Sequence, residues 1–156
     1  MNVFILDRSM EKSAKMLDDA HLKAQINEAC QILMANYNNE RYPDAKIGHV
    51  HHPVTKYYSE ESNRYELFSY LAYLVREYEH RFSKIHQNAM FFIGFGTFAR
   101  IDPKHYGLMN EFQEAKTYVN GSMTDDIKTI RHYISTKPMK KPPTWTNREK
   151  PDWWEV

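Results

Sequence analysis

Three polar side chains recur at helical spacing near the start of the chain: His21, Gln25 and Glu28. At about 100° per residue these positions lie within roughly 60° of one another, so they form one polar row on a helix. Histidine and glutamate are among the side chains that transfer protons in enzymes. The row therefore predicts one wall of a reactive cleft. The same spacing also fits a solvated helix face that carries no chemistry.

An apolar stripe on the same predicted helix places this row at the edge of a buried face. The stripe recurs at i, i+4, i+7 and i+11, and it consists of Leu22, Ile26, Ala29 and Leu33. It is centred about 100° round the helix from the polar row. Asp18 and Asp19 are favourable residues at a helix start, so we predict a helix from there to about Asn36.

The other elements are predicted from apolar periodicity and turn residues. Met1 to Asp7 contains a buried-type run too short for a helix and is predicted to be extended. We expect a loop over the site at 37–53. Further helices are expected at 9–16, 59–85, 110–119 and 125–136. Gly121, with Ser122 or Thr124 as a cap, separates the last two helices, and 90–98 is predicted as a strand-like segment or a turn.

Positive charge gathers toward the end of the chain. Seven lysines and arginines stand from Lys128 to Lys150 against Glu149 alone, next to three tryptophans. Such interleaving suits attraction to phosphates and stacking on bases. A solvated, solubilising tail is the alternative interpretation. Four prolines predict an irregular tail over about 137–156.

Length and composition limit the class of protein. With 156 residues, 42% of them hydrophobic and 14% aromatic, the chain can bury one core, so we predict a single domain over 1–156. The predicted fold class is all-α: a compact single-domain helical bundle with irregular loops and an extended C-terminal tail. The apolar run from Val3 to Leu6 is too short for a signal peptide or a membrane span. We therefore expect a cytoplasmic protein that binds no membrane.

Two further groups of residues give weaker signals. His49, His51 and His52 cluster in the predicted loop, but no carboxylate or cysteine stands at ligand spacing, so we assign no metal and no other cofactor. Cys30 is the only cysteine, which excludes an intramolecular disulfide and indicates a reducing compartment. It has no basic neighbour in sequence, so we predict an unreactive thiol.

A motif in the first third of the chain joins the polar row to its surroundings. Its parts are Glu11 to Lys15, Leu17 to Leu22, Gln25, Glu28 and Gln31 to Leu33. This pattern resembles the N-terminal signature of the pyrimidine-dimer DNA glycosylase family, in which a His or Arg after an Asp-containing turn is followed seven positions later by a glutamate. His21 and Glu28 fall on those two positions. A looser similarity continues at His52-Pro53, at Tyr78 to Phe82, at Ile130-Arg131 and at the two Pro-x-Trp patterns of the tail.

The resemblance implies a DNA glycosylase with an AP lyase step, acting on double-stranded DNA with a damaged or modified pyrimidine. In the family the chain's own α-amine attacks C1′ of the nucleotide, a glutamate assists, and a Schiff base forms with the sugar. The implied catalytic residues here are Met1, Glu28 and His21. An α-amine ordinarily has a pKa of ~7.7 to 8.0 against ~10.4 for lysine, so part of it is nucleophilic near neutral pH. A carboxylate can stabilise the cationic sugar or move protons.

Eight further residues are predicted to bind DNA, because they are polar, basic or aromatic and stand near the motif or in the basic segment. They are Asn2, Arg8, Gln25, Lys128, Arg131, Lys140, Lys141 and Trp145. We expect the protein to act as a monomer in the cytoplasm of a bacterium or a phage-infected cell.

The chain departs from the family pattern at three positions. Asn2 stands where members expose a threonine amine after removal of the initiator, and a residue of this size leaves Met1 in place. Asn27 and Gln31 replace two family arginines, which removes two candidate DNA-contacting charges. These departures keep two alternatives open. One is a catalytically inactive DNA-binding module of the same fold, and the other is an enzyme acting on the modified pyrimidines of phage DNA.

Overall fold

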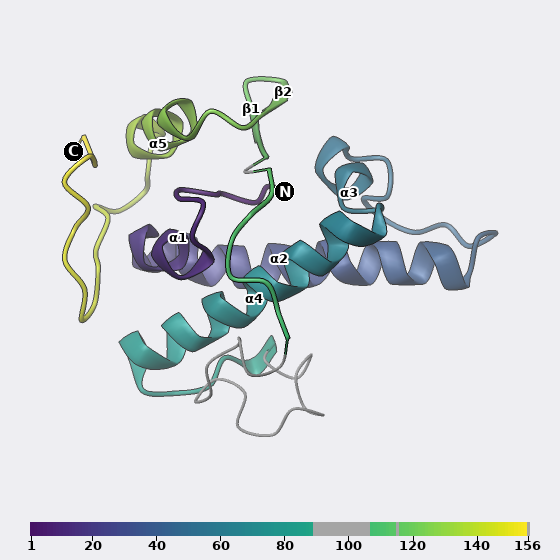
Figure 1. The fold of residues 1–156 in the computed structure, drawn as a ribbon, viewed down its shortest axis with the longest axis horizontal. Helices are drawn as coiled ribbons and strands as arrows, with labels where there is room; N and C mark the ends of the chain where they lie inside the picture. The colour runs from purple at the N-terminus through teal and green to yellow at the C-terminus, as the bar shows by residue number, and fades with distance from the viewer. Residues whose placement is uncertain (89–106, 115, 156) are drawn as a thin grey trace.

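A computed structural model of the chain describes residues 1–88, 107–114 and 116–155. These residues form five α-helices and one two-stranded antiparallel sheet (Figure 1). The elements are α1 (Met10–Met16), α2 (Asp19–Arg41), α3 (Pro53–Tyr57), α4 (Glu61–Phe82), β1 (Thr117–Val119), β2 (Ser122–Thr124) and α5 (Ile127–Thr136). The predicted all-α class is confirmed, since the sheet is a single short hairpin. The 90–98 prediction lies outside the described residues.

The core is built on the two long helices, α2 and α4, which pack against each other, while α1 packs on α4. The predicted stripe of α2 is buried, with exposed fractions of 0% for Leu22 and Ile26. α4 is buried on more than one side, because Tyr70, Ala72, Tyr73 and Leu74 all lie in the core. Such wide burial is typical of a central helix.

The helix boundaries are set by side-chain caps. Ser9 accepts a hydrogen bond from the N–H of Lys12 and begins α1, and Asp18 accepts from two N–H groups of the first turn of α2. α2 continues to Arg41, five residues beyond the predicted end. α4 ends at Phe82, where Ser83 adopts a left-handed conformation with φ of 52°. Ile85, the last residue of the predicted 59–85 helix, lies beyond this end and is 54% exposed.

The prediction of a helix at 110–119 was wrong. In this stretch Glu111 forms an isolated bridge with Ser9, and 117–119 is β1, which pairs with β2. The turn between the strands is Asn120–Gly121, with φ of 48° and 89°. Asn-Gly between two short runs is a strong hairpin signal, because both residues tolerate positive φ. The β-branched residues Thr117 and Val119 then favour the strand over the helix.

The first residues of the chain are extended and buried, as predicted, but they form no regular strand. Their N–H groups are instead bound by side chains: Phe4 by Gln25, Ile5 by Thr117 and Leu6 by Ser13. Buried backbone donors require such partners. The segment is thereby fixed between α2 and the hairpin, and the N-terminus lies near the middle of the molecule (Figure 1).

Residues 137–155 contain no helix or strand, as predicted, but they fold back onto the body of the protein. Trp154 is 4% exposed and packs edge-on against Trp145, with ring centroids 4.9 Å apart. In the described ranges no helix is long and apolar enough to cross a bilayer.

Candidate active site

The predicted polar row lines a cleft of about 810 Å³. His21, Gln25 and Glu28 form one wall from α2, and Phe4 contributes from the N-terminal segment. The opposite wall comes from the start of the tail, residues 137–142. The row thus lies in a cleft and not on a fully solvated face. The tail that the sequence treated as a separate feature forms part of the same cleft.

Gln25 joins α2 to the N-terminal segment. It is 2% exposed, and its Oε1 accepts the N–H of Phe4 at 2.7 Å. Its Nε2 donates to the carbonyl of Asn2 at 3.1 Å and to Oε2 of Glu28 at 2.9 Å. One amide therefore fixes the backbone of residues 2 and 4 relative to the Glu28 carboxylate. These contacts are internal, and direct binding of Gln25 to DNA stays a prediction.

Glu28 lies beside the amine of the chain. Its Oε2 accepts from the backbone N–H of Asn2 at 3.2 Å as well as from Gln25, and its Oε1 is 4.0 Å from the Met1 nitrogen. The Glu28 side chain is 28% exposed, whereas the Met1 side chain is 5% exposed. One carboxylate oxygen is thus held by two donors while the other faces the amine and the cleft.

The Met1 side chain is anchored, which the sequence did not indicate. The hydroxyl of Thr55, on α3, donates to its Sδ at 3.2 Å, and Thr55 is fully buried. Asn2 is also held: its side-chain amide donates to the carbonyl of Tyr118 at 2.6 Å and accepts from the N–H of Tyr118 at 3.0 Å. These contacts place the amine on a rigid support, and they give Asn2 an internal role.

His52 is a further histidine near the N-terminal amine and Glu28. Burial lowers its pKa, the nearby N-terminal ammonium and His49 lower it further, and Glu28 acts in the opposite direction. Its Nδ1 accepts the N–H of Val54 at the start of α3, so this nitrogen carries no proton. The placement of the 37–53 loop over the site stays a prediction. The sequence singled out His52 in a histidine cluster and in the His52-Pro53 similarity, but it gave this residue no role in the site.

His21 lies at the first turn of α2. Its Nδ1 is bonded to the carboxylate of Asp18, whose side chain is fully buried and also accepts the N–H groups of Ala20 and His21. The ring of Phe4 packs edge-on against it, with centroids 5.6 Å apart. The His21 side chain is 12% exposed, on the cleft side. Its orientation is therefore fixed by a carboxylate that the sequence identified only as a cap.

The remaining predicted DNA-binding residues divide into two groups. Arg131, Trp145 and Arg8 each donate to a backbone carbonyl, at 2.8, 3.1 and 3.0 Å. These contacts give all three a structural role. The three lysines of the set are exposed, and they are Lys128, Lys140 and Lys141. Contact of any of the six with DNA stays a prediction.

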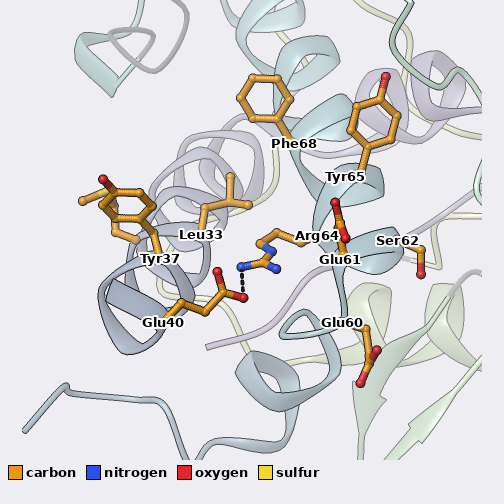
Figure 2. Close-up of a pocket in the computed structure, with 10 residues that line it drawn as sticks. Leu33, Tyr37, Glu40, Glu60, Glu61, Ser62, Arg64, Tyr65 and Phe68 are labelled. Carbon is orange, nitrogen blue, oxygen red and sulfur yellow. Dashed lines mark ion pairs between the residues drawn. The ribbon is translucent and has the colours of Figure 1, made fainter. Parts of the chain in front are cut away.

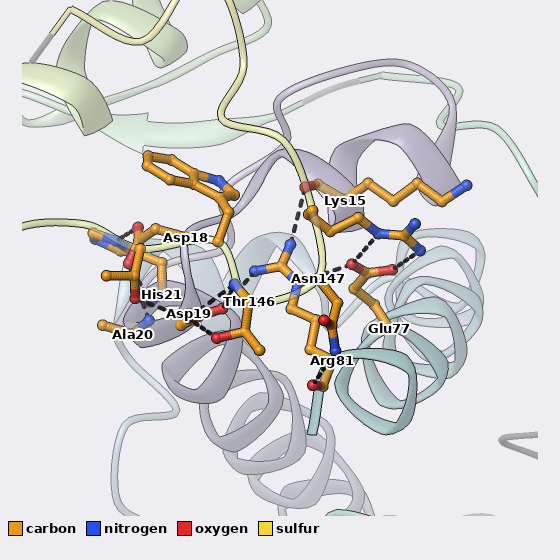
Figure 3. A network of polar contacts seen from close by, with 12 residues as sticks. Lys15, Asp18, Asp19, Ala20, His21, Glu77, Arg81, Thr146 and Asn147 are labelled. Carbon is orange, nitrogen blue, oxygen red and sulfur yellow. Dashed lines mark hydrogen bonds and ion pairs between the residues drawn. The ribbon is translucent and has the colours of Figure 1, made fainter. Parts of the chain in front are cut away.

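A buried polar network fastens the tail beside the cleft (Figure 3). Arg81 is fully buried and donates to Asp19 at 3.0 Å and to Glu77 at 2.8 Å. Asp19 also accepts from the hydroxyl of Thr146 at 2.7 Å, and Glu77 from Arg148 at 2.8 Å. Two tail residues are therefore bound to carboxylates of α2 and α4, and Arg148, counted in the basic segment, is neutralised there.

A larger hollow of about 1230 Å³ lies between α2 and α4 and contains none of the predicted site residues (Figure 2). Its rim carries Glu40, Glu60 and Glu61, and Arg64 is paired with Glu40 at 2.7 Å. The surplus of carboxylates disfavours DNA, since phosphates are repelled by them. The smaller cleft beside the N-terminus remains the candidate.

The structure also bears on the histidine cluster and on Cys30. Among the described residues no group of three histidine, cysteine, aspartate or glutamate side chains is arranged to hold a metal ion. Burial raises the pKa of the Cys30 thiol to about 12. The thiol is therefore protonated at neutral pH, and the prediction that it is unreactive is supported.

Comparison with known families gives a match over the first part of the chain. The family described as pyrimidine dimer DNA glycosylase matches residues 1–90. The matched range is more than half of the chain and contains the polar row, α1, α2, α3 and α4. Comparisons with curated proteins and with solved structures gave no match.

Proposed function

Because the chain belongs to the pyrimidine dimer DNA glycosylase family, we propose that it excises a pyrimidine lesion and cleaves the strand through a Schiff base on the Met1 amine. Family membership makes DNA the substrate and glycosylase activity the general function. The proposed additions are the nucleophile, the role of Glu28 and the associated AP lyase step. The observation that supports them is the position of Glu28, which lines the cleft and has its carboxylate 4.0 Å from the Met1 nitrogen.

The first step forms one bond and breaks another at C1′ of the damaged nucleotide. The neutral amine attacks C1′, the glycosidic bond breaks, and the departing base takes the electron pair and then a proton. A proton next moves from the attached nitrogen to O4′, and the C1′–O4′ bond opens. The product is a protonated imine between Met1 and the opened sugar, and β-elimination of the 3′ phosphate from this imine cleaves the strand.

The geometry suits Glu28 for the proton movement in this sequence. Its Oε2 is occupied by donors from Asn2 and Gln25, which hold the carboxylate in place. Oε1 faces the amine and is the oxygen that can take a proton from nitrogen and return it to O4′. The negative charge also stabilises the cationic sugar that forms as the base departs.

Borohydride trapping tests this proposal. Protein with its native N-terminus is mixed with ultraviolet-irradiated duplex DNA or abasic duplex DNA, and the imine is reduced to a stable adduct. Glu28→Gln and an N-acetylated sample are the test variants, and Glu61→Gln, exposed at the start of α4, is the matched control. Wild type and the control should form the adduct, the acetylated protein should form none, and Glu28→Gln should lose most of it.

Other results would contradict the proposal in distinct ways. An adduct that survives acetylation would place the nucleophile elsewhere. Full strand incision by Glu28→Gln would remove Glu28 from the mechanism. DNA binding by wild type without any adduct would favour the non-catalytic DNA-binding module, and an altered base on an intact strand would favour an enzyme of modified pyrimidines.

A further inference from the structure

The end of the cleft away from Glu28 is rich in cationic side chains. Lys23 comes from α2, and Lys137, Lys140 and Lys141 come from the start of the tail, so two separate segments of the chain supply them. All four are exposed, and His21 lines the same part of the cleft. Lysine and histidine can both donate to anions.

The carboxylates near these cations are already bound within the protein. Asp18 accepts from His21 and from the first turn of α2. Asp19 accepts from Arg81 and from Thr146. Glu28 lies two helical turns away, beside the amine. The uncompensated charge at this end of the cleft is therefore positive, which favours an anionic ligand.

The buried Asp18 determines which atom of His21 faces a ligand. Because Nδ1 is bonded to the carboxylate, the ring is held with Nε2 as its other polar atom, and this nitrogen has no hydrogen-bond partner within the described residues. An imidazole that carries a proton on Nε2 donates from this atom, and such an N–H suits a phosphate oxygen.

His21 is separated along α2 from Glu28, whose carboxylate is the group beside the amine. It stands seven residues from Glu28 on one helix, which at 1.5 Å per residue is about 10 Å along the axis. A group that moves a proton must be within hydrogen-bonding reach of it. A DNA strand bound with one sugar at the amine would instead place a neighbouring backbone phosphate near His21.

We propose that Asp18 is a positioning residue that holds His21 over a phosphate subsite, in which His21 and the lysines 23, 137 and 140 bind one backbone phosphate flanking the damaged nucleotide. The proposal rests on the proposed function, because it places the damaged sugar at Met1 and Glu28. It identifies the ligand as a DNA phosphodiester and assigns His21 to binding, not to proton transfer.

Binding to a duplex with an unreactive abasic analogue tests the subsite without any chemistry. Each flanking phosphodiester is replaced in turn by an uncharged methylphosphonate, and dissociation constants are measured at several salt concentrations. The proteins are wild type, His21→Gln, Asp18→Asn and the control His132→Gln, an exposed histidine on α5 paired with Glu155. Asparagine can still cap α2, so Asp18→Asn removes the charge with little effect on the helix start.

We expect His21→Gln to weaken binding on the order of tenfold. One methylphosphonate position should abolish the difference between wild type and His21→Gln, because each change removes the same contact. Asp18→Asn should act in the same direction with a smaller effect, and His132→Gln should match wild type. In trapping assays the loss for His21→Gln should fall more on the dissociation constant than on the rate at saturating DNA.

The subsite proposal would be overturned if His21→Gln weakened binding to every methylphosphonate duplex by the same factor. It would also be overturned if His21→Gln bound the unmodified duplex with wild-type affinity. His21→Gln decides the matter even if Asp18→Asn does not fold. A missing trapped adduct in wild type contradicts the Schiff-base proposal alone, since the methylphosphonate comparison depends only on binding.

Discussion

Replacement of Gln25 by methionine tests whether one buried amide holds the nucleophile and Glu28 together. Methionine has a similar length and volume and packs in cores, but it cannot hydrogen-bond as an amide does. In the structure the Gln25 amide binds the Phe4 N–H, the Asn2 carbonyl and the Glu28 carboxylate. The substitution therefore removes three contacts and leaves the shape of the site nearly unchanged.

The expected loss of stability follows from the backbone groups left without partners. A buried donor or acceptor that loses its partner costs about 1 to 3 kcal/mol, so the Phe4 N–H and the Asn2 carbonyl together predict a loss of about 3 kcal/mol. For a domain of this size that lowers Tm by about 6 to 12 °C. The activity loss should be larger, because displacement of a reacting group by about 1 Å can cost on the order of a hundredfold in rate.

Two measurements separate these effects. Urea unfolding followed by tryptophan fluorescence gives the stability, and single-turnover borohydride trapping at 20 °C gives the activity of the folded variant. Gln31→Met, an exposed substitution on the same helix, is the matched control and should change neither. A folded Gln25→Met protein that is trapped at the wild-type rate would refute the conclusion that this amide positions the amine.

Two further predictions concern the tail network and the hairpin. Burial works to raise the pKa of Asp19 and Glu77, but hydrogen bonds from Thr146 and from Arg148 outweigh it and leave both pKa values lowered. Both carboxylates therefore stabilise the fold above their unfolded pKa of about 4, and this stabilisation is lost as the pH falls through their pKa values in the folded protein. Urea unfolding midpoints measured from pH 7 to pH 3 should therefore drop at the acidic end. The drop should be less steep in Asp19→Asn. Gly121→Ala should lower the free energy of unfolding by about 1 kcal/mol in the same assay, because alanine is strained at a φ of 89°. The space around the glycine is open, so the added methyl group meets no other atom. An unchanged unfolding midpoint would contradict this prediction.

The parts of the fold that could be predicted are those with a strong local period. The stripe on α2 and the long helix α4 are buried as expected. They could be predicted because apolar residues recur at helical spacing over several turns, which rarely happens by chance. The hairpin was missed because its strands have three residues each, too few for a period to appear. The Asn120–Gly121 turn was the available signal, and it was interpreted as a break between helices.

The candidate site could be predicted only in part, for a different reason. His21, Gln25 and Glu28 share one helix, so spacing alone places them together. Thr55 and Asn2 meet the site from other elements, and no local pattern indicates that a threonine hydroxyl will bind the Met1 sulfur. The charges of the basic segment were counted correctly, but a count does not show that Arg148 is paired with a glutamate 71 residues away.

The fastening of the tail also bears on when the protein acquires its cleft during synthesis. Thr144 and Thr146 bind Asp19 across 125 and 127 residues of sequence, and the hydroxyl of Thr117 accepts from the N–H of Ile5 in the N-terminal segment. A ribosome releases the polar row before the opposite wall and its anchors, which follow more than a hundred residues later. Contacts of such long range form slowly and only when both partners are available. A nascent chain therefore carries the amine and Glu28 without a cleft to hold DNA, and the site closes only after more than a hundred further residues have been made.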